Sequence, residues 1–257
     1  KFNKNILVEK PFVTSLKDLL IIKNKIKNKK ILIKCAYHQR YRPISLKIKD
    51  TIAKGHIGKV YYINIIHRKF RSIPVQSNYF SLKKYSGGGP LIDLGTHYFD
   101  LIAWIFNFPM IRNISCKCSS YIFKKNKKYL PFKKFNNEEL AVGQINFKNK
   151  ILLNFEFSYA LNTAHEEIKI EIYGEKGCII WPYKNYWILR KNKMVKKKFK
   201  FKNNKASIEQ INDFMKKIKN VDKIKENNKT LYEIEYIVKL IDKLYYSSKT
   251  NKQINYE

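Results

Sequence analysis

The apolar segments of this 257-residue chain change character along its length, and this change constrains the fold most. Residues 5–8 and 31–37 are short apolar runs typical of buried parallel strands. Between them, residues 16–28 carry apolar side chains at helical spacing, and Thr14 or Ser15 can cap the helix that they predict. Two such strands joined by a helix make a β-α-β unit, which requires a parallel sheet and a right-handed crossover.

Strand-like stretches then follow one another between residues 113 and 181. This order predicts a mostly antiparallel sheet, distinct from the β-α-β start. The alternating segment 59–67 is expected to join it as an antiparallel strand, and the lysines of residues 196–202 are expected to cover a solvated sheet face. The other predicted strands are 113–122, 140–147, 151–159, 168–173 and 178–181.

Three glycines and a proline, at residues 87–90, precede the most apolar helical segment. Glycine accepts backbone angles that other residues cannot, and it lets a ligand approach the main chain. Proline suits the first turn of a helix, so we predict a helix over residues 90–106. Further helices are predicted at 44–54, 207–219 and 230–246.

Polar side chains share one face of the helix predicted at 90–106, because Asp93, His97, Asp100 and Trp104 are spaced i, i+4, i+7 and i+11. A carboxylate and an imidazole one turn apart are well placed for chemistry. The alternative is an ordinary i,i+4 pair on a solvated face, worth roughly a few tenths of a kcal/mol. These residues alone leave both interpretations open.

The formal charge of +33 suggests a nucleic-acid or anionic-membrane partner. However, 47 of the 53 basic residues are Lys and only 6 are Arg, whereas specific phosphate or base recognition usually relies on Arg. Lys is abundant together with Asn, Ile and Tyr, as expected if nucleotide composition selected it for surface charge. Non-specific electrostatic binding, which would weaken steeply with salt, is the remaining alternative.

The four cysteines, at positions 35, 116, 118 and 178, form neither a disulfide framework nor a pair of zinc-ligand motifs. No apolar run approaches the roughly 18 residues of a membrane span, and no signal peptide is visible. We therefore expect reduced thiols in a cytoplasmic protein, with no membrane partner and no metal site.

Three stretches of the sequence together form a recognisable pattern. Glu9-Lys10-Pro11 ends a predicted strand, residues 87–89 precede Asp93 and His97 at helical spacing, and residues 172–177 form a strand and turn. Their order and spacing resemble the Gfo/Idh/MocA family of nicotinamide-dependent oxidoreductases, which act mainly on sugars, sugar nucleotides and cyclitols. Lys54-Gly55-His56-Ile57-Gly58-Lys59-Val60 also lies where that family turns from a helix into its large sheet.

The resemblance implies an α/β fold: the remainder of a parallel Rossmann-type domain, then an α+β substrate domain with a large, mostly antiparallel open sheet. It assigns residues 1–42 to the dinucleotide-binding part, 43–229 to the substrate and oligomerisation domain, and 230–257 to a helix that packs back on the first part. In the family about 90 residues precede the Glu-Lys-Pro segment and carry the Gly-x-Gly-x-x-Gly turn for the cofactor pyrophosphate. Without that part, we expect this chain to be unstable or to expose apolar surface.

The resemblance also implies NAD or NADP as cofactor and assigns roles to individual residues. His97 is the expected base for a substrate hydroxyl, and Lys10 is expected to stabilise the developing oxyanion. Asp93 is expected to hold a substrate hydroxyl or to orient the imidazole. Glu9, Lys10 and Pro11 would shape the nicotinamide side of the cleft, and the bond before this proline is often cis in the family.

Four further residues have two interpretations each. Arg40 resembles an arginine that lies near cofactor and substrate in the family, and a salt bridge at the surface or the edge of the core is its alternative. Tyr85, Tyr159 and His165 could line the substrate pocket, but packing or surface positions suit them better.

The resulting hypothesis is a sugar or cyclitol dehydrogenase that lacks its N-terminal part in this chain and forms a dimer or tetramer. One alternative is a non-catalytic remnant that serves as a binding or scaffolding module. A third possibility is a basic polyanion-binding protein, although no specific nucleic acid is expected.

Overall fold

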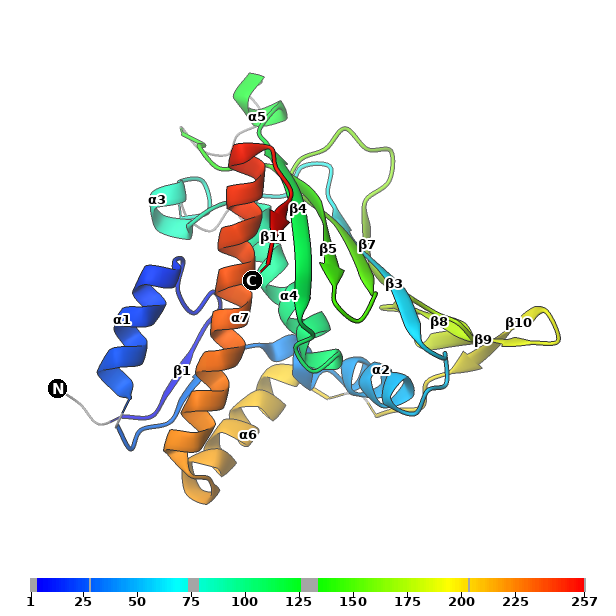
Figure 1. Cartoon of the computed structure of the whole chain (residues 1–257), viewed down its shortest axis with the longest axis horizontal. Coiled ribbons are helices and arrows are strands. Elements are labelled where there is room, and N and C mark those ends of the chain that lie inside the picture. Colours follow the sequence, from blue (N-terminus) through cyan, green and yellow to red (C-terminus); the bar gives the residue numbers. More distant parts are fainter. Residues whose placement is uncertain (1–3, 28, 74–78, 126–133, 203, 257) are drawn as a thin grey trace.

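A β-α-β unit forms one side of the computed structural model, which describes residues 4–27, 29–73, 79–125, 134–202 and 204–256 (Figure 1). Strands β1 (Ile6–Val8) and β2 (Ile33–Cys35) pair in parallel. Helix α1 (Leu16–Ile26) joins them, and the Ser15 side chain caps it by accepting a hydrogen bond from the Asp18 N–H. The predicted β-α-β start is therefore confirmed.

The second half of the fold is a nine-stranded sheet in the order β10-β9-β8-β7-β3-β6-β5-β4-β11. Every neighbouring pair is antiparallel except β3–β6, so the prediction that residues 59–67 form a purely antiparallel strand is wrong on one side. Alternation in a sequence reports which face of a strand is buried, not the direction of its neighbours. The strands are β3 (Val60–Arg68), β4 (Ile111–Ser119), β5 (Leu140–Phe147), β6 (Leu152–Ser158), β7 (Glu167–Gly174), β8 (Gly177–Trp181), β9 (Asn185–Arg190), β10 (Lys193–Lys198) and β11 (Ile254–Asn255).

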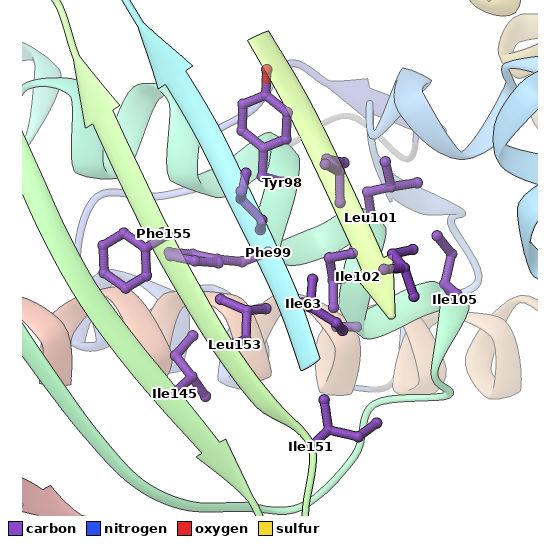
Figure 2. Packing of buried hydrophobic residues seen from close by; sticks show 14 of the residues in the cluster. Ile63, Tyr98, Phe99, Leu101, Ile102, Ile105, Ile145, Ile151, Leu153 and Phe155 are labelled. Carbon is purple, nitrogen blue, oxygen red and sulfur yellow. The ribbon is translucent and has the colours of Figure 1, made fainter. Parts of the chain in front are cut away.

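Helix α4 (Pro90–Ile105) lies against one face of this sheet and builds the main core. Figure 2 shows Phe99 and Ile102 of α4 pointing towards Ile63 of β3 and Phe155 of β6. The apolar side chains of α4 pack against the strand residues that face the helix, and together they exclude water from the layer between helix and sheet. The other helical segments are η1 (His38–Tyr41), α2 (Pro43–Ala53), α3 (Lys83–Ser86), α5 (Ile122–Lys125), α6 (Ala206–Asn220) and α7 (Lys223–Thr250).

Helix α7 connects the two sheets (Figure 1). It packs against β4 of the large sheet and against α1 and β2 of the small one. This helix has 28 residues and begins at Lys223, seven residues before the predicted start at 230. Asp222 caps it there, because its side chain accepts hydrogen bonds from the N–H groups of Ile224 and Lys225. The first turns are rich in Lys and Asn and carry little apolar periodicity, so the sequence pattern does not reveal them.

Two other predicted strand boundaries differ from the structure. The strand predicted at 113–122 ends at Ser119, because the buried Glu139 carboxylate accepts hydrogen bonds from Tyr121, Ile122 and Phe123 and starts α5 there. The stretch 196–202 is only partly strand: β10 ends at Lys198, and Phe199 is buried.

Some apolar side chains of the β-α-β unit are exposed. Ile6, Leu20 and Ile21 expose 42%, 47% and 45% of their surface.

In the described part of the chain, no helix is both long and apolar enough to span a membrane.

Candidate active site

The glycine segment before α4 fits a close backbone contact. A Cβ on Gly89 would lie 2.1 Å from the main-chain oxygen of Glu138, and one on Gly88 would lie 2.0 Å from the Tyr245 hydroxyl. The Glu138 Oε1 atom also accepts hydrogen bonds from the N–H groups of Gly89 and Leu91. Protein atoms thus occupy the space that a Cβ would fill at Gly88 and Gly89.

Lys10 and Asp93 form an ion pair across the two parts of the fold. Lys10 follows β1, and its Nζ donates to Asp93 Oδ1 at 2.6 Å and to the Asp93 main-chain oxygen at 3.0 Å. The two side chains are only 13% and 12% exposed. The Lys10–Pro11 peptide bond is cis, as the resemblance implied.

Tyr159 completes the polar contacts of Asp93. Its hydroxyl donates to Asp93 Oδ2 at 2.8 Å, and its ring is buried with Ile73 and Phe123. Burial, and then the charge of Asp93, raise the pKa of Tyr159 well above its usual value. Tyr159 is thus both a packing residue and a direct partner of the site, a role that the sequence pattern does not reveal.

His97 lies one turn after Asp93 on α4. Within the described part of the chain its Nδ1 is buried without a hydrogen-bond partner, and no hydrogen bond joins it to Asp93. Burial, followed by the nearby positive charge of Lys10, lowers the pKa of His97 to about 2. The imidazole is therefore neutral at physiological pH.

Two histidines that the sequence analysis did not select surround His97. The His38 ring meets the His97 ring edge to face, with centroids 5.0 Å apart. His67 lies 2.9 Å from the Tyr98 hydroxyl through Nδ1, and burial lowers the pKa of His67 to about 4. No cluster of His, Cys, Asp or Glu among the described residues has the arrangement of a metal site.

Arg40 lies on η1 and contacts Asp100 of α4, in a buried ion-pair network. It donates to both carboxylate oxygens of Asp100, at 2.9 and 2.5 Å, and to Glu233 at 2.6 Å. Complete burial raises the pKa of Asp100 to about 6 against the opposing attraction of Arg40, so the carboxylate is still mostly ionised at neutral pH. These contacts match the salt-bridge interpretation, and the cofactor role of Arg40 remains a prediction.

The remaining predicted site residues are spread around the cluster. Glu9 is exposed, and its Oε2 accepts a hydrogen bond from the Lys10 N–H at 3.2 Å. Pro11 packs in an apolar seam with Tyr37 and Thr96. Tyr85 is 50% exposed. His165 is exposed in a loop that lines a separate hollow with Arg68 and Tyr183.

A sequence profile of the GFO/IDH/MocA C-terminal domain matches residues 45–180, just over half of the chain. The chain belongs to the GFO/IDH/MocA family. This match covers Asp93, His97 and Tyr159, while Lys10 lies before it.

Relatives within the GFO/IDH/MocA family agree with this membership. "Oxidoreductase P35" of Formosa agariphila is 24% identical over 185 residues, which are 70% of this chain and 52% of the relative. "D-glucoside 3-dehydrogenase" of Escherichia coli K12 is 26% identical over 157 residues, which are 57% of this chain and 43% of that protein. The chain thus spans about half the length of these curated relatives.

A solved structure of levoglucosan dehydrogenase with NADH and levoglucosan superposes with a TM-score of 0.77 at 15% identity. It covers 98% of this chain, which in turn covers 74% of that protein. At this identity the likeness establishes the fold. The predicted class, α/β with a small parallel sheet and a large, mostly antiparallel one, is confirmed.

Proposed function

We propose that the protein transfers a hydride between a nicotinamide cofactor and a secondary hydroxyl of a sugar, sugar nucleotide or cyclitol. The observation that carries this proposal is the largely buried Lys10–Asp93 ion pair beside the neutral His97, in a chain of the GFO/IDH/MocA family. Relatives named as a D-glucoside dehydrogenase and a levoglucosan dehydrogenase support a sugar-like substrate.

Oxidation of a secondary alcohol requires a group that accepts the hydroxyl proton, and His97 is our candidate. Its unpaired Nδ1 is a buried polar atom, and such atoms are rare unless a ligand or another group completes them. Burial and Lys10 keep His97 neutral. A negative charge that develops on the substrate oxygen would raise the proton affinity of the imidazole beside it.

Lys10 would stabilise that developing negative charge. Two of its three ammonium hydrogens point to Asp93, which leaves one for a substrate oxygen. Asp93 then serves mainly to position Lys10, with Tyr159 fixing its second carboxylate oxygen. In the reverse direction, the same groups would return the proton to the carbonyl oxygen.

The nicotinamide cofactor, NAD or NADP, supplies the hydride chemistry. Residues Glu9, Lys10 and Pro11 fit its nicotinamide side, because they follow the carboxyl end of β1 in a parallel sheet, where such ligands bind. Arg40 is a weaker candidate, since two carboxylates already hold its guanidinium. The domain division at residues 42 and 229 is part of this proposal.

The test is a spectrophotometric screen of sugars and cyclitols with NAD and NADP. Lys10→Ala and His97→Ala should each lower kcat/KM by about 100-fold or more, the usual range for loss of a general base or oxyanion partner. His165→Ala is the matched control, because His165 is exposed away from α4. Folded protein without affinity for nicotinamide would favour the alternative of a non-catalytic remnant.

We also propose a homo-oligomer that forms through the sheet face opposite α4. Val142 is 36% exposed there, in a shallow hollow that it shares with Asn64 and Gln144. A Val142→Lys substitution should shift the protein to monomers in light scattering. An unchanged mass would reject this surface as the interface.

A further inference from the structure

A cavity of about 440 Å³ lies at the C-terminal end of α4. Trp104 of α4 lines it, eleven residues after Asp93, which places the two Cα atoms about 16 Å apart along the helix. The other walls come from η1, α2, α6 and the start of α7, which Figure 1 shows at the same end of the molecule. The volume suits a small metabolite rather than a polymer.

Every carboxylate that lines this cavity already has a cationic partner. Asp213 pairs with Lys217 at 3.0 Å and also accepts the Tyr41 hydroxyl at 2.7 Å. Glu226 pairs with Lys34 at 2.8 Å, and Glu233 pairs with Arg40 at 2.6 Å. The negative charges of these three carboxylates are therefore already neutralised by neighbouring lysine and arginine side chains.

Two lysines in the wall have no such partner. Neither Lys49 nor Lys229 forms an ion pair with a residue that the structure describes. The Lys49 ammonium lies 4.2 Å from the centre of the Trp104 ring. It donates to the Trp104 main-chain oxygen and, at 3.2 Å, to the Asn107 side chain, and neither acceptor is charged. Burial, and then repulsion from Arg40, lower the pKa of Lys49, and Lys229 adds to that repulsion. Two positive charges thus face one cavity without a counter-ion among the described residues.

The backbone of the wall is strained at the same place. Asn107 and Phe108 have φ of 57° and 55°, and such left-handed angles are a genuine outlier for a bulky residue such as Phe. The Phe108 ring packs against Tyr236, at 5.4 Å between centroids. Strained backbone of this kind clusters at ligand sites, where the surrounding structure maintains it.

We propose that this cavity binds a small molecule through a dianionic phosphate group, held by Lys49 and Lys229. Two ammonium groups without an ion-pair partner among the described residues match the charge of one phosphate monoester. The apolar rings of Trp104 and Phe108 leave room beside them for an organic part. The cavity shares Arg40 with the candidate cofactor residues, but Lys49 and Lys229 have no part in the proposed hydride transfer, so this proposal does not depend on it.

Calorimetric titration in about 150 mM NaCl tests the proposal, a salt level at which diffuse surface attraction is screened. The probes are inorganic phosphate and glycerol 3-phosphate, at pH 8. We expect saturable binding of one equivalent. Tighter binding of glycerol 3-phosphate would identify an organic phosphate as the ligand, and tighter binding of inorganic phosphate would identify the free ion.

Three variants and one control separate a built site from general basicity. Lys49→Ala and Lys229→Ala should each weaken binding about tenfold or more, and Leu46→Trp should weaken it by filling the cavity without a change in charge. Lys193→Ala, an exposed lysine of β10, is the matched control. Absence of saturable binding, an equal loss in Lys193→Ala and Lys229→Ala, or full binding in Leu46→Trp would each overturn the proposal.

Discussion

Both carboxylate oxygens of Asp93 are occupied, one by Lys10 and the other by Tyr159. Asp93 therefore depends on partners from two distant parts of the chain. A hydrogen bond to a charged group contributes about 1.5–3 kcal/mol to stability, more than a neutral one. The position of Lys10 relative to His97 thus depends, through Asp93, on the buried hydroxyl of Tyr159.

Tyr159→Phe should lower the free energy of unfolding by about 2 kcal/mol, because it removes the hydrogen bond to Asp93 and keeps the ring packed. Urea unfolding at pH 7.5 measures this. Tyr61→Phe, at a position that is 54% exposed, should change stability by less than about 0.5 kcal/mol. Equal losses in the two variants would contradict a special role of the Tyr159 hydroxyl.

His97 should make the protein acid-sensitive. Its pKa is about 2 in the folded protein and about 6.5 unfolded, so below pH 6.5 the unfolded chain binds a proton that the folded one does not. Stability that is present above pH 6.5 is therefore lost as the pH falls towards 2. Between pH 7.5 and 5.0 this loss amounts to about 2 kcal/mol.

In urea unfolding, His97→Asn should reduce the loss between the two pH values by about 2 kcal/mol. Buried His67, whose pKa is also lowered, should cause part of the loss that remains. His165→Asn should retain the whole loss, because that side chain is exposed. The same pH dependence in wild type and His97→Asn would show that other groups cause it.

At the scale of elements, the start of α4 depends on how closely its backbone approaches the segment at Glu138. Gly89→Ala would place a methyl group 2.1 Å from a main-chain oxygen, which cannot move without displacing its own segment. Gly55, by contrast, has a φ of +67° but nothing within 4 Å of the added Cβ. The two glycines are therefore required for different reasons.

Gly89→Ala should destabilise by more than about 3 kcal/mol, the range of severe steric substitutions. Gly55→Ala should cost about 1–2 kcal/mol, because only the left-handed angle is unfavourable there. Thermal or urea unfolding gives the ranking. Equal costs would mean that the backbone near Glu138 relaxes freely.

At the scale of the whole molecule, α7 makes the two sheets depend on each other. Ile234 is buried with Leu19 and Cys35 of the β-α-β unit, whereas Leu244 is buried in the core of the large sheet. Both side chains are 0% exposed. Loss of either contact should therefore weaken the entire fold rather than one part.

Ile234→Ala and Leu244→Ala should each cost about 2–5 kcal/mol and leave a single unfolding transition. Hydrogen exchange of the β4–β5 amides is the measurement, and both variants should lower their protection. Protection that falls only in Leu244→Ala would show that the β-α-β unit unfolds independently.

The sequence by itself determined the local elements and the motif residues. Apolar periodicity placed the β-α-β unit and α4, and motif spacing selected Lys10, Asp93 and His97, which the fold brings to one place. These features are local or belong to a recognisable pattern, so they can be read without knowledge of long-range contacts.

Only the tertiary structure decided the parallel β3–β6 pairing, the protein partners of the glycine segment, and the position of His38, His67 and Tyr159 around the site. It also paired Arg40 with Asp100 and Glu233, residues that lie 60 and 193 positions away. The physical reason is that periodicity reports which side of an element is buried. Which distant side chain meets it there depends on how the elements pack.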